Sequence, residues 1–128
     1  MYRIVIVGAG KGGNSLLEIF SRNNDMTIVG VFDKFPDAVA FKLAEKLNSP
    51  TSCDISQITS LEVDIVVNVT GDYKITQEIE EHVSSEVEVI SNKSARVIWE
   101  LIIAREELLA KMERNNNALT FLYEIGLL

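Results

Sequence analysis

The sequence has few of the residues that build disulfide-linked, metal-binding or disordered proteins. It contains one cysteine, Cys53, and one histidine in 128 residues. A single cysteine excludes an internal disulfide and fits the reducing cytoplasm, the compartment that we expect. With two prolines and 47% hydrophobic residues, the composition is that of a folded domain rather than a disordered segment. We therefore predict a globular protein without a metal site.

Basic residues and long apolar runs are also scarce. Twelve Lys and Arg stand against nineteen Asp and Glu, which gives a formal net charge of −7. This balance argues against binding to nucleic acid or to an anionic membrane surface. No apolar run reaches the roughly 18 residues of a membrane span, and glycines interrupt the N-terminal run that would otherwise serve as a signal peptide. We expect neither a nucleic-acid nor a membrane partner.

A glycine motif, in contrast, is present at the N-terminus. An apolar run over residues 4–7 ends in G-x-G-x-x-G, with glycines at Gly8, Gly10 and Gly13, and apolar residues then recur at helical spacing from Leu16. This order predicts a buried strand, a tight turn and a helix N-terminus, which together suit a pyrophosphate. The first glycine makes the turn, the second lets phosphate approach the backbone, and the third lets helix and strand pack closely.

An acidic residue follows at the position that this motif requires. Asp33 lies twenty residues after Gly13, at the end of a second apolar run. A carboxylate there accepts hydrogen bonds from the adenosine ribose of NAD and repels the 2′-phosphate of NADP, while Lys34 would soften that preference. A Walker phosphate loop is excluded because Lys and Ser/Thr do not follow Gly13. A glycine turn that holds no dinucleotide stays open as an alternative.

Segments typical of strands and helices alternate along the chain. Strands are expected at residues 2–7, 26–33, 51–53, 63–69 and 87–90. Helices are expected from the glycines to about Ser21, over 36–47, briefly after Asp54 as the capping residue, and over 74–83. In the second helix, the residues expected on the apolar face are Val39, Ala40, Leu43, Ala44 and Leu47. This alternation predicts an α/β fold, a doubly wound parallel sheet with strand order 3-2-1-4-5 and a long C-terminal helix.

Three loops are expected to meet at the carboxyl ends of the strands, at the switch point between the first and fourth strands. The predicted cofactor-binding residues there are Gly8, Gly10, Lys11, Gly12, Gly13, Asp33, Lys34, Thr70, Gly71 and Asn92. Two of these loops also have a purely structural interpretation, with Asp72 as a helix N-cap and Asn92-Lys93 as a solvated helix start. Cys53 is expected near the end of the third strand, where it could face the nucleotide, although a small buried thiol is the favoured interpretation.

These residues resemble the N-terminal nucleotide-binding half of the homoserine dehydrogenase and aspartate dehydrogenase-like families. The resemblance rests on the glycine loop, Asp33, Val69-Thr70-Gly71 and Ser91-Asn92-Lys93, and it runs from Met1 to about Ile98. It implies NAD as the cofactor, with Asn92 and Lys93 facing the nicotinamide end. We assign no catalytic residue, since Ser91 stands where the family has Ala and nothing after Lys93 supplies an obvious substrate-holding group. Lys93 is the sole candidate for proton transfer.

The C-terminal part carries a different pattern. Helical spacing continues through Trp99 to Met112, residues 115–117 are three asparagines that interrupt it, and an apolar pattern then resumes. A heptad frame over 101, 104, 108, 111, 115, 118, 122 and 125 places apolar residues at six of eight positions, and the frame starting at Ile98 fits equally well. We expect this helix to pair with a partner chain, most simply as a homodimer, or with a following domain. A C-terminal helix docked on its own sheet stays open as an alternative.

Residues 119–128, Leu-Thr-Phe-Leu-Tyr-Glu-Ile-Gly-Leu-Leu, resemble the entry helix of GAF sensor domains. This resemblance implies that the chain is the front part of a sensor such as a histidine kinase. The leading hypothesis is therefore an NAD(H)-binding regulatory domain over 1–95, coupled to a signalling and dimerisation helix over 96–128. The alternative is the nucleotide-binding domain of an NAD-dependent dehydrogenase that lacks its substrate domain. An oligomerising scaffold with an empty site is a third possibility.

Overall fold

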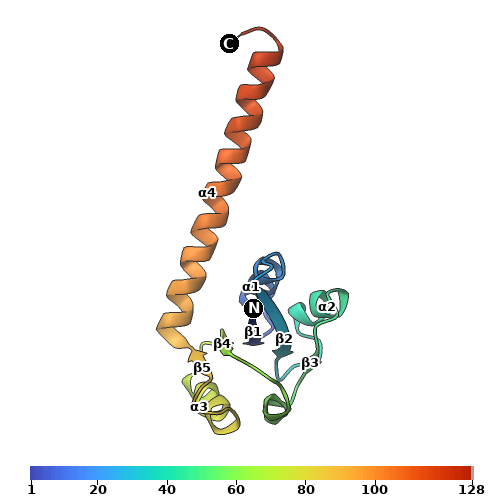
Figure 1. Ribbon diagram of the computed structural model, residues 1–128, viewed down its shortest axis with the longest axis vertical. Coiled ribbons are helices and arrows are strands. Elements are labelled where there is room, and N and C mark those ends of the chain that lie inside the picture. The colour runs from blue at the N-terminus through green and yellow to red at the C-terminus, as the bar shows by residue number, and fades with distance from the viewer. Residues whose placement is uncertain (128) are drawn as a thin grey trace. The chain divides into compact units, whose positions relative to one another are not determined.

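The computed structural model describes residues 1–127, except for the side chain of Asn92. Within these residues it has the predicted α/β fold, with five parallel strands in the order β3-β2-β1-β4-β5. The strands are β1 (Tyr2–Val7), β2 (Met26–Phe32), β3 (Thr51–Ser52), β4 (Ile65–Asn68) and β5 (Glu88–Ile90). The chain moves from β1 out to β3 and then returns to β4 beside β1 (Figure 1). The sheet is therefore doubly wound.

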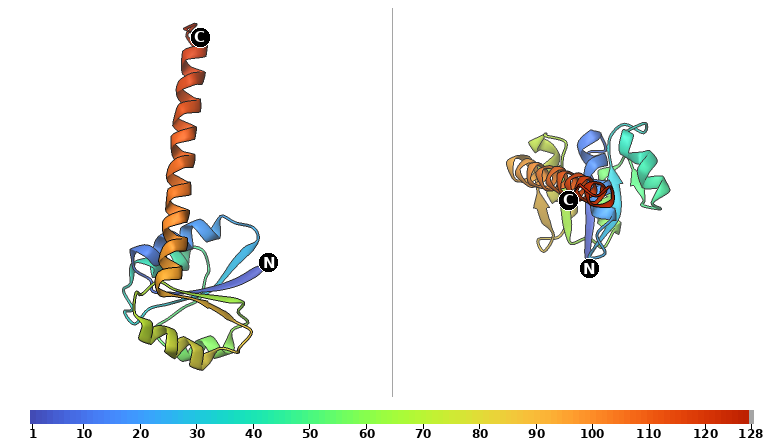
Figure 2. Two further views of the ribbon diagram at one scale, coloured as in Figure 1. Left: turned by 90° about the vertical axis from the view of Figure 1, so that its left-hand side faces the viewer. Right: turned by 90° about the horizontal axis from the view of Figure 1, so that it is seen from above.

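Helices cover both faces of the sheet. On one face α1 (Lys11–Ser21) packs against α2 (Val39–Lys46), and on the other α3 (Tyr73–His82) packs against the short 3₁₀ helix η1 (Ile55–Ser60) (Figure 2). The buried side of α1 is formed by Leu16, Leu17 and Phe20. These residues recur at the spacing of one helix face, which is why this segment buries a single stripe against the sheet.

The central strand β1 is buried on both faces, as a parallel strand flanked by helices must be. Val5 and Ile6 are fully buried. The core cluster around this strand consists of Val5, Val7, Phe32, Ile58, Val66 and Ile79. Each such side chain contributes about 1.5–3 kcal/mol through removal of its apolar surface from water. The glycine loop therefore directly follows a strand that is buried on both faces.

The predicted face of the second helix is partly wrong. Val39 and Leu47 are 56% and 40% exposed, whereas Phe41 is only 8% exposed. The helix begins at Val39 rather than Pro36, and the Ala40 N–H donates to the Ala9 carbonyl at 2.8 Å. This bond ties the first turn of α2 to the glycine loop, and Phe41 in the same turn is buried.

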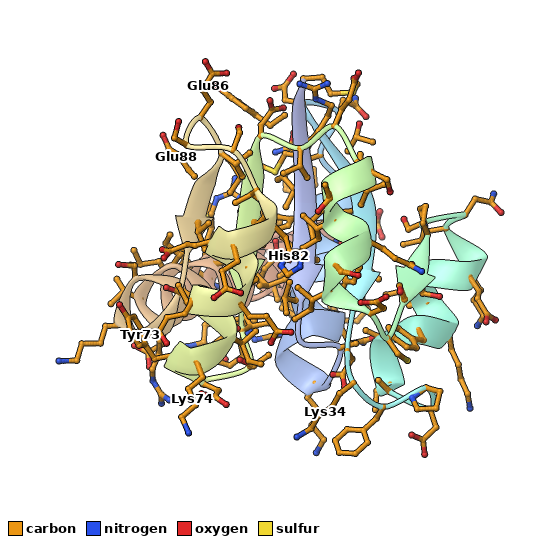
Figure 3. The ribbon with its side chains drawn as sticks, turned by 90° about the horizontal axis from the view of Figure 1, so that it is seen from below. Lys34, Tyr73, Lys74, His82, Glu86 and Glu88 are labelled. Carbon is orange, nitrogen blue, oxygen red and sulfur yellow. The ribbon has the colours of Figure 1, made fainter. Side chains whose placement is uncertain are left out.

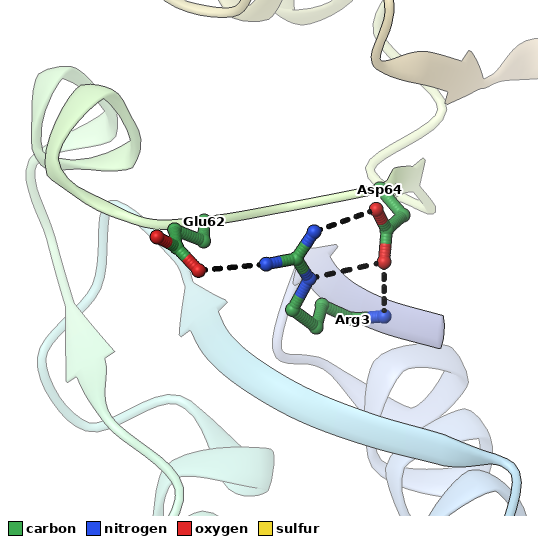
Figure 4. A network of polar contacts seen from close by, with 3 residues as sticks. All are labelled: Arg3, Glu62 and Asp64. Carbon is green, nitrogen blue, oxygen red and sulfur yellow. Dashed lines mark hydrogen bonds and ion pairs between the residues drawn. The ribbon is translucent and has the colours of Figure 1, made fainter. Parts of the chain in front are cut away.

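The edge formed by the amino ends of the strands carries a network of ion pairs (Figure 4). The Arg3 guanidinium donates to Asp64 at 3.0 and 3.1 Å and to Glu62 at 2.7 Å, and the Arg3 backbone N–H donates to Asp64 at 2.8 Å. These bonds to Arg3 lower the pKa of Asp64 to about 2. The network joins the start of β1 to the residue that precedes β4.

The chain divides into two compact units, Met1–Arg96 and Val97–Leu128. The helix α4 (Asn92–Glu124) has its first turn in the first unit and the rest of its length in the second. The predicted long C-terminal helix is confirmed, and it continues through the three asparagines at residues 115–117. Asparagine is only a modest helix breaker compared with Gly or Pro, so the break in the apolar pattern there does not break the helix. Large apolar side chains on α4 are exposed, among them Leu101, Leu108, Met112, Leu119 and Phe121. Leu128, the last residue of the predicted apolar tail, lies outside the described residues. Among residues 1–127, no helix is long and apolar enough to cross a membrane.

Candidate functional site

A pocket of about 660 Å³ lies at the carboxyl ends of β1, β2 and β4. Its described lining residues are Val7, Gly8, Gly10, Asp33, Lys34, Phe35, Cys53, Asp54, Ile55, Val69, Thr70, Asp72, Ile75 and Glu78. Figure 3 shows Lys34 and Lys74 at this edge and Glu86 and Glu88 at the opposite one. The pocket therefore occupies the switch point of the sheet, where ligands of doubly wound folds bind.

The glycine loop has the geometry that its motif predicts. Gly8 has a positive φ of 106°, and a Cβ there would lie 3.1 Å from the Thr70 nitrogen and the Val69 carbonyl carbon. A Cβ on Gly13 would overlap the Gly8 carbonyl oxygen, whereas a Cβ on Gly10 would meet nothing within 4 Å. Gly8 and Gly13 are thus required by the turn and by close packing. Gly10 leaves open space beside the backbone, which a ligand can enter.

The start of α1 differs from the starts of the two helices on the other face. No side chain in the described part of the chain caps α1, whose N-cap is Gly10. In contrast, the Asp54 side chain caps η1 and the Asp72 side chain caps α3, as the sequence indicated for both. An uncapped first turn leaves backbone N–H groups and the positive end of the helix dipole without a side-chain partner. An anionic ligand would satisfy them.

Asp33 connects the end of β2 to the glycine loop. Its Oδ2 accepts the Ala9 N–H at 2.8 Å, and its Oδ1 accepts the Phe35 N–H at 3.0 Å. Each carboxylate oxygen has a second lone pair, so both oxygens can still accept from a ribose hydroxyl. The Lys34 ammonium lies over the Phe35 ring, 5.1 Å from its centroid. Asp33 is therefore placed as the sequence predicts, and it also holds the loop.

The other predicted residues are divided between the pocket wall and its surroundings. Thr70 lines the pocket, whereas Lys11, Gly12, Gly71 and Lys93 are not among the described lining residues. Lys11 and Lys93 are exposed at the starts of α1 and α4. The predicted contact of the Asn92 side chain falls outside the described side chains. The geometry therefore gives Lys93 no support as a proton-transfer residue.

Cys53 is a correction to the sequence prediction. Its thiol is exposed and lines the pocket rather than being buried. The reason is that β3 is only two residues long and ends before Cys53, so this residue lies in the connection to η1 at the rim of the site. Sequence reasoning also did not identify Phe35, Ile75 and Glu78 as wall residues. Their one available signal was proximity to strand ends and to the start of α3.

Carboxylates outnumber cations on the described wall. Asp33, Asp54, Asp72 and Glu78 line the pocket with one ammonium group, that of Lys34. The hydroxyl and backbone N–H of Ser56 donate to Asp54 and lower its pKa. A wall of this charge disfavours ligands with additional phosphate groups.

In the part of the chain that the structure describes, no group of three or more His, Cys, Asp or Glu could hold a metal ion.

Comparison with known proteins identifies the fold of this chain but assigns it to no family. No protein-family model matches the sequence, and no curated protein matches it. An NAD-binding protein from Listeria innocua is 22% identical, with a TM-score of 0.54 over 69% of this chain and 26% of that one. Prephenate dehydrogenase from A. aeolicus, solved with hydroxyphenyl propionate and NAD⁺, is 18% identical, with a TM-score of 0.59 over 70% of this chain and 32% of that one.

A third solved structure extends the same likeness. Apo scyllo-inositol dehydrogenase from Lactobacillus casei is 19% identical, with a TM-score of 0.58 over 82% of this chain and 33% of that one. This chain thus spans about a quarter to a third of the length of these three proteins. Together with the strand order, these likenesses show a Rossmann-type fold. The resemblance of residues 119–128 to a GAF entry helix stays a prediction.

Proposed function

We propose that this chain is an NAD(H)-binding domain of the dehydrogenase type, the nucleotide-binding part of an oxidoreductase. The observation that carries the proposal is the uncapped start of α1, which opens onto a pocket bordered by Gly8, Gly10 and Asp33. The solved structures of similar fold support it, because two of them are described as NAD-binding or were solved with NAD⁺. This puts the dehydrogenase alternative ahead of the sensory hypothesis.

The pocket fits a dinucleotide that lies across the end of β1. The pyrophosphate would contact the open backbone at Gly10 and the first turn of α1, and the adenosine ribose would contact Asp33. The second nucleoside would then extend toward Thr70 on the β4 side. Bound NAD would supply the hydride acceptor or donor, and a further group of residues would have to hold a substrate against it. We assign no such group, and hence no catalytic residue, within this domain.

The proposal is tested by calorimetric titration of the purified chain with NAD⁺, NADH, NADP⁺ and ADP. We expect NAD⁺ and NADH to bind, and NADP⁺ to bind about tenfold or more weakly, because its 2′-phosphate would meet the Asp33 carboxylate. The substitution Asp33→Ala should weaken NAD⁺ binding and reduce the discrimination against NADP⁺. If none of the four ligands binds, the glycine loop is only part of the fold and the proposal is wrong.

A second candidate is a regulatory domain that couples dinucleotide binding to α4. It is favoured by the continuity of this helix, which begins directly after β5 and runs to Glu124 without a break. A continuous helix that starts at the carboxyl end of β5 is a suitable output element for a cytoplasmic sensor that dimerises through its C-terminal helix. Addition of NAD⁺ should then change the monomer–dimer equilibrium of the full chain in analytical ultracentrifugation. If NAD⁺ does not change this equilibrium, the regulatory candidate is wrong and only the dehydrogenase-type proposal remains.

A further inference from the structure

Strand β4 ends in a buried asparagine whose side chain has a partner for each of its polar groups. Asn68 is 1% exposed. Its Oδ1 accepts the Thr70 backbone N–H at 3.0 Å and the Thr70 hydroxyl at 2.6 Å. Its Nδ2 donates to the Asp72 carbonyl at 3.2 Å and to Thr76 Oγ1 at 2.9 Å. A buried amide costs free energy unless it is paired, and here both donors and the acceptor are used.

These hydrogen bonds fold residues 68–72 into one compact unit, the β4–α3 turn. The Thr70 hydroxyl, which donates to Asn68, also accepts the Asp72 N–H at 3.1 Å. The Asp72 carboxylate in turn accepts the Lys74 N–H at 2.9 Å and so begins α3. While Asn68 holds the Thr70 hydroxyl hydrogen, Thr70 cannot donate it to a ligand. The Thr70 side chain is therefore part of the turn, and Asn68 is the group that sets the turn's shape.

The β4–α3 turn lies against the glycine loop. The Val69 N–H donates to the Val7 carbonyl at 2.9 Å, and the Thr70 nitrogen lies 3.1 Å from the position of a Cβ on Gly8. Val69, Thr70 and Asp72 all line the pocket. Asn68 lies behind this wall, with its side chain directed into the turn. A change at Asn68 would consequently move a wall of the pocket without removing an atom that lines it.

We propose that Asn68 is a positioning residue for the dinucleotide, one that holds the β4–α3 turn at the distance from Gly8 that the second nucleoside requires. This inference rests on the proposed function. Asp33 follows β2 on one side of β1, and the turn follows β4 on the other side. A ligand with its pyrophosphate at the glycine loop and its adenosine ribose at Asp33 therefore extends its second half toward the turn. Loss of Asn68 should affect a dinucleotide more than a mononucleotide.

The test compares NAD⁺ with AMP on the full chain that carries Asn68→Ala. Both dissociation constants are measured by calorimetry at a temperature at which thermal melting shows the variant to be fully folded. We expect NAD⁺ affinity to fall about tenfold or more, which corresponds to about 1.4 kcal/mol, and AMP affinity to stay within about twofold. General destabilisation would weaken the binding of both ligands by the same factor. A larger loss of affinity for NAD⁺ than for AMP, called the split below, therefore reports on positioning.

The matched control is Asp64→Asn, at the residue that directly precedes the same strand. It removes the ion pair with Arg3 and lowers stability, yet both affinities should stay within about twofold of those of the unsubstituted chain. Equal losses for NAD⁺ and AMP in Asn68→Ala, or the same loss of NAD⁺ affinity in the control, would overturn the positioning role.

A second variant covers the case in which Asn68→Ala does not fold. Thr76→Val removes one partner of the Asn68 amide and is expected to give the same split, at about threefold. If Thr76→Val shows no split, the positioning role is again overturned. An unsubstituted chain that binds neither NAD⁺ nor AMP would instead overturn the proposed function, so the two failures are distinguishable.

Discussion

At the scale of single residues, two glycines in one loop serve different purposes. A Cβ on Gly13 would overlap the Gly8 carbonyl oxygen and lie 3.6 Å from the Ile6 side chain. A Cβ on Gly10 would meet nothing within 4 Å, and the Gly10 backbone, with φ −78° and ψ −157°, is open to any residue. Gly13 is therefore required by the packing of α1 on β1. Gly10 is the position where added bulk would affect a ligand and not the fold.

This difference gives a paired prediction. Gly13→Ala is expected to lower the free energy of unfolding by about 1–3 kcal/mol, because α1 must move away from β1 to accept the methyl group. Gly10→Ala is expected to keep the melting temperature and to weaken NAD⁺ binding about tenfold or more, because the methyl group blocks the approach of the pyrophosphate. Thermal denaturation and calorimetric titration of both variants test this. Unchanged NAD⁺ affinity in Gly10→Ala would contradict the proposed position of the pyrophosphate.

The residues that sequence reasoning identified are those whose roles follow from local spacing. The positions of the three glycines, of Asp33 and of the capping residue Asp72 relative to the apolar runs are sufficient to predict where they lie. The bond from the Ala9 N–H to Asp33 joins residues 24 positions apart, and no local pattern indicates it. The Asn68 network is also invisible in the sequence, because a buried amide at a strand end becomes meaningful only once its four partners are known.

At the scale of elements, the alternation of strands and helices was sufficient to predict the sheet. Parallel strands joined by right-handed crossovers leave few possible orders, and the predicted 3-2-1-4-5 order is confirmed. Element ends were less predictable. The fourth strand is predicted to begin at Val63 but begins at Ile65, directly after Asp64, whose backbone still bonds to Arg3 and Glu88 on the neighbouring strands. An apolar run therefore indicates that a strand is present but not the residue at which its pairing begins.

The segment between β3 and η1 provides a direct probe of the pocket. Cys53 is the one cysteine of the chain, and its exposed thiol lines the wall beside Asp54. A bound dinucleotide should cover this thiol, so saturating NAD⁺ is expected to slow its reaction with a thiol reagent about tenfold or more. The rate is measured by absorbance with and without NAD⁺, and nicotinamide alone serves as the matched control. Equal rates with and without bound NAD⁺ would place the ligand away from η1.

At the scale of the whole molecule, the two compact units differ in what they can bind: the first has a ligand pocket, and the second has apolar side chains that another protein segment could cover. Met1–Arg96 has its own core and a pocket, whereas the second unit, which begins at Val97, consists mainly of α4 up to Glu124, with exposed apolar side chains. A lone helix of this kind gains most of its stability from burial against another element. The division into a nucleotide-binding domain over 1–95 and a signalling helix over 96–128 stays a prediction, as does the homodimer. Both depend on what covers the apolar side of α4.

The homodimer can be tested at one position of the heptad frame. Leu101 and Leu108 are 65% and 58% exposed, and in a paired helix both would lie in the seam, with Asn115 as a polar seam residue that selects one register. Leu108→Glu would bury a charge in that seam, so we expect it to convert dimers to monomers in analytical ultracentrifugation while NAD⁺ affinity stays unchanged. Glu113→Gln, on the opposite side of the same frame, should remain dimeric. A chain that is monomeric without any substitution would show that α4 does not pair with a second copy, and its apolar side would then require a different protein segment.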